Sequence, residues 1–357
     1  MRHSRELPSF RLPAILCALA IALVAVPDVL ASDGAAAPPG TPVGGHGQLR
    51  VSGGRLLDER GASVRLKGMS TAGLQWFGGA VDRASLAALR DDWKCDIVRL
   101  ALYVGEGGYA SRPALKELVK KGVDLAIELG LYVIIDWHVL TPGDPNHRTY
   151  SGAVDFFKEM AAAYGSRPNV IYEIMNEPNG SVTWSKDLKP YAERLVAAIR
   201  AIDPDNIVLI GSGTWSQDVD AAAKDPVAGS NLMYTVHFYA GTHGDSLRRK
   251  ITRALDAGAA VFCSEWGTSR SNGTDGVFID ESEEWLDFLD KNDISWVNWS
   301  LCNKDETSAA LKAGERGVRK ETPLVPDRLG PGGIPIWTED QLGESGAYVR
   351  AKMREGR

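Results

Sequence analysis

The chain has 357 residues, of which 44% are hydrophobic and 24% are charged, and its formal net charge is −6 at pH 7. This length suits one large domain or two small ones. Because the charged residues form no basic stripe, the composition argues against a nucleic-acid-binding protein and favours a neutral ligand.

Residues 1–31 are predicted to be a secretory signal peptide. A basic start is followed by the apolar run PAILCALAIALVAV, and Val29-x-Ala31 has the small residues expected at a cleavage site. The run is too short to be a good membrane anchor. We therefore expect a secreted protein, extracellular or alternatively periplasmic, without membrane contact after cleavage. The Gly/Pro/Ala-rich residues 32–46 predict a flexible linker.

From Gly47 onward, eight short apolar runs predict β-strands. The runs are near-continuous rather than alternating, as expected of strands that are buried on both faces. They begin at Val64, Ile97, Tyr132, Val170, Ile207, Met233, Ala259 and Ser295. Helical patterns lie between them, including apolar stripes within 115–126, 153–164 and 280–289.

This alternation predicts an α/β fold, a (β/α)8 TIM barrel, which typically needs roughly 250 residues. A doubly wound open sheet is the alternative, but no Gly-rich phosphate loop follows the first strand. The stretch GQLRVSGGRLLDERG before the first strand predicts a β-hairpin at the base of the barrel. Residues 47–357 are therefore expected to form a single domain, in which the C-terminal stretch is a closing helix and tail.

The active site of such a barrel lies at the C-terminal ends of its strands. Six predicted strands end there in polar and aromatic residues: Arg99 and Tyr103, Asp136 to His138, Asn176 and Glu177, His237 and Tyr239, Glu265 and Trp266, and Asn298 and Trp299. Glu177 and Glu265 end the fourth and seventh strands and should face each other across the barrel mouth. Paired carboxylates that flank a bond are what glycosidic cleavage requires.

Other interpretations of these residues are weaker. An isolated glutamate is usually a surface or ion-paired group, but two at strand ends beside Arg, His, Tyr and Asn indicate catalysis. His138 and His237 could hold zinc together with Glu265, but no close-spaced ligand motif such as HExxH is present. A serine nucleophile would lack a GxSxG elbow. We therefore expect neither a metal nor a cofactor.

Tryptophan and cysteine give two further indications. The chain has 10 Trp against 8 Phe, and several Trp residues fall at or just beyond strand ends. Flat apolar faces beside polar groups suit sugar rings. After cleavage three cysteines remain, and they are expected to be buried thiols. The sequence leaves open whether Cys263 and Cys302 form a pair.

The runs GLQWF, GLYVIIDWH, NVIYEIMNEPNG, HFYAGTHG, SEWGTS and ISWVNWSLCNK resemble bacterial endo-β-1,4-glucanases of glycoside hydrolase family 5, in particular secreted bacillus-type cellulases. The resemblance extends from about Gly47 to about Ala313. It implies that residues 47–357 are a catalytic domain that hydrolyses internal bonds of cellulose and soluble β-glucans. It also implies retention of anomeric configuration through a covalent glycosyl-enzyme intermediate.

The resemblance also implies roles for particular residues. Glu177 corresponds to the acid/base and Glu265 to the nucleophile, and Asn176 would bind the sugar 2-hydroxyl. The residues that would hold and tune the two glutamates are Arg99, His138, His237 and Tyr239. The subsites would be lined by Trp76, Tyr103, Trp215, Trp299, Lys304 and Glu306. The sequence departs from the family pattern at Ala72, where THGLQW has a histidine.

Fold and catalytic pair do not fix the sugar, so mannan, xylan and mixed-linkage glucan remain alternative substrates. A non-catalytic glycan-binding barrel is the alternative of a different class, although binding alone needs no carboxylate pair. We expect a β-1,4-glucan polysaccharide as the partner and a monomeric protein without a carbohydrate-binding module.

Overall fold

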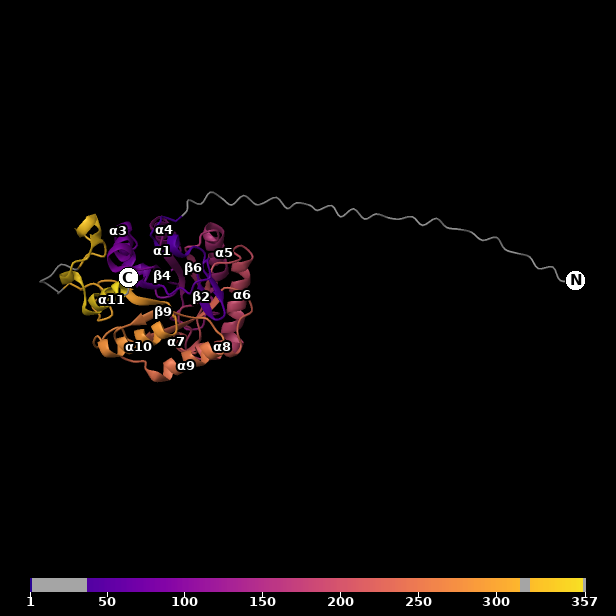
Figure 1. Ribbon diagram of the computed structural model, residues 1–357. Helices are drawn as coiled ribbons and strands as arrows, with labels where there is room; N and C mark the ends of the chain where they lie inside the picture. The colour runs from indigo at the N-terminus through magenta and orange to yellow at the C-terminus, as the bar shows by residue number, and fades with distance from the viewer. Residues whose placement is uncertain (2–36, 315–321, 356–357) are drawn as a thin grey trace. The chain divides into compact units, whose positions relative to one another are not determined.

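A computed structural model describes Met1 and residues 37–314 and 322–355 of the chain (Figure 1). Apart from Met1, the signal peptide predicted over 1–31 lies outside the described residues. Among the residues that the structure describes, no helix has the length and apolarity needed to cross a membrane.

Eight parallel strands close into a barrel, which confirms the predicted (β/α)8 fold. Each strand pairs with the next in chain order, and the last pairs with the first. The strands are β3 (Lys67–Thr71), β4 (Ile97–Tyr103), β5 (Tyr132–His138), β6 (Val170–Glu173), β7 (Val208–Ile210), β8 (Leu232–Tyr239), β9 (Val261–Gly267) and β10 (Trp296–Leu301). Almost all of their residues are buried, because helices cover the outside and side chains fill the inside.

Helices surround the barrel (Figure 1). The longer ones are α4 (Leu115–Leu129), α5 (Ala153–Tyr164), α6 (Lys189–Arg200), α9 (Asp245–Asp256) and α10 (Ile279–Lys291). The shorter ones are α2 (Leu74–Phe77), α3 (Arg83–Ala88), α7 (Gly213–Ser216) and α8 (Val219–Lys224). The three predicted apolar stripes correspond to α4, α5 and α10. Gly130 ends α4 in the left-handed conformation that favours glycine, with φ of 68°.

The hairpin predicted at the barrel base is present. Strands β1 (Arg50–Ser52) and β2 (Arg55–Leu57) pair antiparallel. Leu56 of this hairpin belongs to an apolar cluster with Ile97 of β4 and other residues that point into the barrel near its N-terminal end. The hairpin therefore closes the end of the barrel opposite the strand ends that carry the polar residues.

The flexible linker predicted over 32–46 is contradicted at its C-terminal end. Residues Pro42–His46 form the helix α1, whose N-terminus is capped by the side chain of Thr41. Val43 is buried in the base cluster, and its N–H donates to the carbonyl of Gly130. Proline is well suited to the first position of a helix, so this Gly/Pro/Ala-rich stretch can form the short packed helix α1 although its composition is typical of a linker.

The C-terminal stretch ends in the predicted closing helix, α11 (Glu344–Arg354), preceded by the short ribbon of β11 (Arg328–Leu329) and β12 (Pro335–Ile336). Helix α11 contacts the turn Leu89–Trp93 that follows α3 (Figure 1), where Arg354 donates to the carbonyl of Asp92 over 2.7 Å.

Cys95, Cys263 and Cys302 are buried free thiols. Cys263 pairs in register with Trp296 at the start of β10, whereas Cys302 follows its end. Six residues of extended strand, about 20 Å, separate those two levels, and this excludes a disulfide.

Candidate active site

A cleft of about 960 Å³ opens at the C-terminal ends of the strands. Eleven of the thirteen predicted site residues line it, and the other two, Arg99 and Asn176, are fully buried behind the lining. The cleft therefore gathers side chains that come from β3 to β10 and the loops that follow them, as expected for a barrel of this type.

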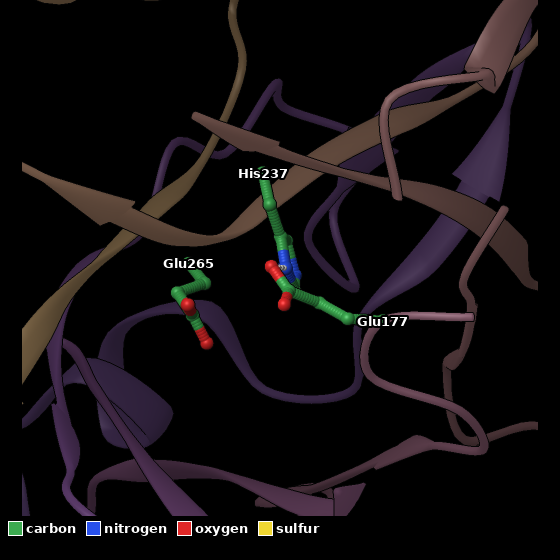
Figure 2. Close-up of side chains that lie close together, drawn as sticks. All are labelled: Glu177, His237 and Glu265. Carbon is green, nitrogen blue, oxygen red and sulfur yellow. Dashed lines mark hydrogen bonds and ion pairs between the residues drawn. The ribbon is translucent and has the colours of Figure 1, made fainter. Parts of the chain in front are cut away.

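Glu177 and Glu265 face each other in this cleft. Glu177 follows β6, and Glu265 lies in β9. Three atoms lie within 4.8 Å of one another: one carboxylate oxygen of Glu177, one of Glu265 and a ring nitrogen of His237 (Figure 2). Both are buried for the most part. In retaining glycosidases the two carboxyl groups are about 5–5.5 Å apart, whereas inverting enzymes keep them about 6.5–9.5 Å apart to admit a water.

Arg99 connects the carboxylates beneath the cleft. Its Nη1 donates to Oε2 of Glu265 over 3.1 Å, and its Nε donates to Oε2 of Glu173 over 2.6 Å. Burial alone would lower the pKa of Arg99, but the negative charges around it, including Asp136, outweigh burial and raise it. The guanidinium therefore stays charged and places a positive charge beside Glu265.

Tyr239 supplies the second donor to Glu265. Its hydroxyl donates to Oε1 over 2.8 Å, so each oxygen of Glu265 has a partner. Burial and the charge of Glu265 raise the pKa of Tyr239 well above its usual value, so the phenol remains protonated and remains a donor. A carboxylate held in this way is oriented for attack.

His237 lies against Glu177. Its Nδ1 is 3.0 Å from Oε1 of Glu177, and its Nε2 is 2.9 Å from the hydroxyl of Ser264. Burial would lower the pKa of His237, but the neighbouring carboxylates of Glu173, Glu177 and Glu265 outweigh burial and raise it to about 9. Glu177 therefore has a titratable imidazole as its partner, whereas Glu265 is held by a guanidinium and a phenol, and the two acids have different environments.

Aromatic side chains form the walls of the cleft. Trp76 packs edge-on against Tyr103, which stacks on His138 at 3.9 Å between ring centroids, and Trp299 completes this side. Trp215 follows β7, across the barrel mouth from the loop that carries Trp76 after β3. Trp76 and Trp215 are 54% and 46% exposed, and among the described residues the other aromatic side chains are buried or half-buried. These two flat faces are open to a ligand.

Trp215 is held by an unusual backbone. Thr214, Trp215 and Ser216 all have φ between 53° and 56°, a left-handed conformation that costs free energy in residues other than glycine. The turn is tied to the segment after β6 that carries Glu177, because Ser216 Oγ donates to the carbonyl of Asn176 over 2.6 Å. The N–H of Trp215 donates to the carbonyl of Pro178 over 3.0 Å.

The last two predicted subsite residues also line the cleft. Lys304 and Glu306 form an ion pair of 2.5 Å after β10. Glu306 is largely buried, whereas the side chain of Lys304 is more than half exposed. The pair therefore offers a polar edge near the aromatic wall.

Several residues of the site were missed from the sequence. Glu173 is fully buried, accepts from Arg99 and Ser264, and lies 3.6 Å from His237. An acid inside the apolar run VIYEIM was a visible signal, because a buried carboxylate needs partners. Thr214, Gln217, His243 and residues 271–273 also line the cleft, but they lie in loops where no pattern marked them.

Among the described residues, the group of acid and histidine side chains close enough to hold a metal ion is Glu177, His237 and Glu265. This differs from the zinc set weighed from the sequence, which used His138. Both ring nitrogens of His138 are already engaged, one by Asp136 at 2.6 Å and the other by Asn176 at 3.1 Å.

A (β/α)8 barrel whose mouth holds two facing carboxylates between exposed aromatic walls is the arrangement of a barrel glycoside hydrolase. Residues 57–305 match the cellulase family, glycosyl hydrolase family 5. The chain belongs to this family.

Named relatives agree with this assignment. Endoglucanase 5 of Pectobacterium carotovorum subsp. carotovorum is 50% identical over 317 residues, which are 88% of this chain and 59% of that protein. The chain thus spans little more than half the length of that relative. Among solved structures, Cellulase Cel5C_n is 42% identical, with a TM-score of 0.81 over 90% of this chain and 96% of that one. The catalytic domain of Thermobifida fusca endoglucanase Cel5A in complex with cellotetraose is 36% identical, with a TM-score of 0.79 over 88% and 99%.

Proposed function

We propose that this chain is a retaining endo-β-1,4-glucanase that hydrolyses internal bonds of cellulose and soluble β-glucans. The observation that carries the proposal is the separation of Glu177 and Glu265, whose nearest ligand oxygens lie within 4.8 Å. That spacing suits direct attack by one carboxylate and leaves no room for the water that inversion needs.

The two acids then divide the work according to their environments. Glu265, held by Arg99 and Tyr239, attacks the anomeric carbon as the nucleophile. Glu177 donates a proton to the leaving oxygen, and a covalent glycosyl-enzyme forms. Glu177, now ionised, takes a proton from the water that releases the sugar. Asn176 lies behind the lining, where its Oδ1 accepts from Arg99 and its Nδ2 donates to Nε2 of His138 and to the carbonyl of Val139, so it orients His138 beneath the sugar.

The substrate class follows from the walls of the cleft. Trp76 and Trp215 present exposed rings on opposite sides of the catalytic pair, so sugars can stack on both sides of the bond that breaks. Binding on both sides favours cleavage within a chain rather than at its end. The names of the relatives, endoglucanase and cellulase, and the cellotetraose complex support β-1,4-glucan as the substrate.

Two further parts of the proposal concern the protein's state. We propose that it is secreted, on the basis of the basic and apolar N-terminal sequence. We also propose that it acts as a monomer, since the site described above is complete within one chain. Size-exclusion chromatography with light scattering, and activity in culture supernatant against periplasmic and cell fractions, test these points.

The activity is tested by reducing-sugar release from carboxymethylcellulose, barley glucan, mannan and xylan. We expect the highest rates on the β-1,4-glucans, and a preference for mannan or xylan would overturn the substrate. NMR of fresh hydrolysate from cello-oligosaccharides whose own reducing end has been reduced should show the β-anomer of the new reducing end first. Initial α-anomer would overturn retention and the role of Glu265 as nucleophile.

A further inference from the structure

A buried chain of hydrogen bonds runs from Arg99 to the acid Glu177 through residues that the reaction itself does not use. Glu173 accepts from Arg99 on Oε2 and from Ser264 on Oε1, the latter over 2.6 Å. Ser264 in turn is 2.9 Å from Nε2 of His237. Glu173 and Ser264 are both fully buried, so no solvent competes for these contacts.

An irregularity in β9 brings Ser264 to this position. Thr235 pairs with Phe262 and His237 pairs with Glu265, so two steps along β8 oppose three along β9. Phe262 packs in the cluster inside the barrel base, whereas Cys263 and Trp266 pack in the outer core. Regular alternation would turn either Ser264 or Glu265 outward. The extra residue lets both face inward, and re-aiming a side chain beside a site is a known use of such bulges.

The contacts determine where the protons lie. Arg99 and His237 lower the pKa of Glu173 to about 2 despite its burial, so Glu173 is ionised and can only accept. The hydroxyl of Ser264 therefore donates to Glu173, and its oxygen accepts from His237. His237 must then carry a proton on Nε2. Its Nδ1 is left to share one proton with Oε1 of Glu177.

We propose that Ser264 and Glu173 are positioning residues that hold the proton of His237 on Nε2, so that the acid Glu177 retains the proton it shares with Nδ1. Without the acceptor at Ser264, neutral His237 can move its proton to Nδ1 and donate it to ionised Glu177. That arrangement is stable but has no proton for the leaving group. In the wild type the acceptor at Ser264 keeps the remaining proton of His237 on Nε2. Loss of the shared proton would then leave the lone pair of Nδ1 facing a lone pair of Glu177 Oε1, which is unfavourable.

Other charged groups surround His237 and stay in place in this scheme. Glu265 of β9 and Tyr239 of β8 lie on the cleft side. Asp136 and His138 of β5 interact electrostatically with both Glu173 and His237, and Arg99 of β4 pairs with Glu173. A change at Ser264 leaves all of these charges unaltered, which makes it the cleanest position for a test.

The test compares Ser264→Ala with Ser264→Thr, which keeps the hydroxyl, and with Thr235→Val as the matched control. Thr235 is a buried residue of the same barrel, and among the described residues its hydroxyl has no partner. The measurement is kcat/KM against pH for cellotetraose and for 2,4-dinitrophenyl β-cellobioside, whose leaving group needs no proton. Thermal melting checks that each variant is folded.

We expect Ser264→Ala to move the alkaline limb of the kcat/KM–pH profile for cellotetraose to lower pH by about one unit. At a pH on that limb, this is about a tenfold loss of kcat/KM. On the dinitrophenyl substrate the change should stay within about threefold, a difference of no more than about 0.65 kcal/mol. Ser264→Thr should restore the limb, and Thr235→Val should leave it in place. Equal losses on both substrates with an unmoved limb would overturn the proposal, as would a limb that Ser264→Thr fails to restore in a folded protein.

The inference rests on the proposed role of Glu177, and one more variant separates the two. If Glu177 is the acid, Glu177→Gln should lose activity on cellotetraose far more than on the dinitrophenyl substrate. Adding Ser264→Ala to Glu177→Gln should then cause no further shift of the limb. Equal activity of Glu177→Gln on both substrates would overturn the role of Glu177, whereas an unmoved limb in Ser264→Ala alone overturns the role of Ser264.

Discussion

Arg99 Nη2 lies 2.6 Å from Asn176 Oδ1, and this hydrogen bond fixes which end of the Asn176 amide faces His138. A guanidinium only donates, so the atom beside it must be the amide oxygen. Nδ2 of Asn176 then donates to Nε2 of His138, and His138 must carry its proton on Nδ1, where it donates to Asp136. Burial and the charge of Arg99 lower the pKa of His138 to about 3, so His138 stays neutral.

Asn176→Asp should therefore change the protonation of His138. The variant places an acceptor oxygen opposite Nε2, and a proton on that nitrogen becomes favourable. We expect the pKa of His138 to rise from about 3 into the range that NMR of its Cε1–H can follow, while the wild-type signal stays constant above pH 5. An unchanged titration in Asn176→Asp would show that Asn176 does not set the state of His138.

Glu265→Gln should abolish turnover and leave binding of cello-oligosaccharides largely intact. The amide keeps the shape of the side chain but cannot form the glycosyl-enzyme, and loss of a covalent catalyst costs several orders of magnitude. Arg99 keeps its ion pair with Glu173, so the barrel should still fold. Calorimetry with cellotetraose checks that binding is retained, and single-turnover assays check that turnover is lost. Wild-type-like turnover would refute the role of Glu265.

Tyr239→Phe should be much milder. It removes one hydrogen bond of 2.8 Å to Glu265 but leaves the donor Arg99 on the other oxygen. A hydrogen bond to a charged group contributes about 1.5–3 kcal/mol, which corresponds to roughly a ten- to hundredfold loss in kcat/KM. The comparison with Glu265→Gln under the same assay decides the point, since equal losses would contradict the supporting role.

His237 should make stability depend on pH. Its folded pKa of about 9 exceeds the usual value of about 6.5, so its contribution is complete below pH 6.5 and is lost as pH rises through 9. The melting temperature of the wild type should therefore approach that of His237→Gln between pH 6 and 9.5. Thr235→Val, which has no charge to lose, should keep a constant difference from the wild type. A difference for His237→Gln that is constant or grows with pH would contradict the assignment.

Binding on the Trp76 side should depend more on the indole than on Ala72. Trp76 offers an exposed ring, whereas Ala72 is a buried wall residue without a polar group. An indole face is worth on the order of 1.5–3 kcal/mol by area, against about 0.5–1.5 kcal/mol for one neutral hydrogen bond. Trp76→Ala should lower kcat/KM on cellopentaose by about tenfold or more, and Ala72→His should raise it by about tenfold at most. A harmless Trp76→Ala would remove this subsite.

The sequence predicts the barrel well because its signals are local. The runs for β4 and β5 match the observed strands to the residue, and Glu177 and Glu265 stand at strand ends as expected. Ser264 could not be assigned, because its role depends on a bulge that appears only when β8 and β9 are paired. The roles of Glu173 and Asp136 likewise depend on a closed barrel that brings four strands around Arg99. The left-handed turn at Trp215 contains no glycine among its three positive-φ residues, so the sequence does not predict it.

The bulge in β9 makes the length of that strand matter more than most of its side chains. Many substitutions within 261–267 keep the register, but deletion of one residue between Phe262 and Glu265 would restore strict alternation with β8. Glu265 would still face inward, but the serine beneath it would turn toward the helices or be lost. Homologous barrels that exchange this strand by recombination must therefore join at matching positions on both sides of the extra residue.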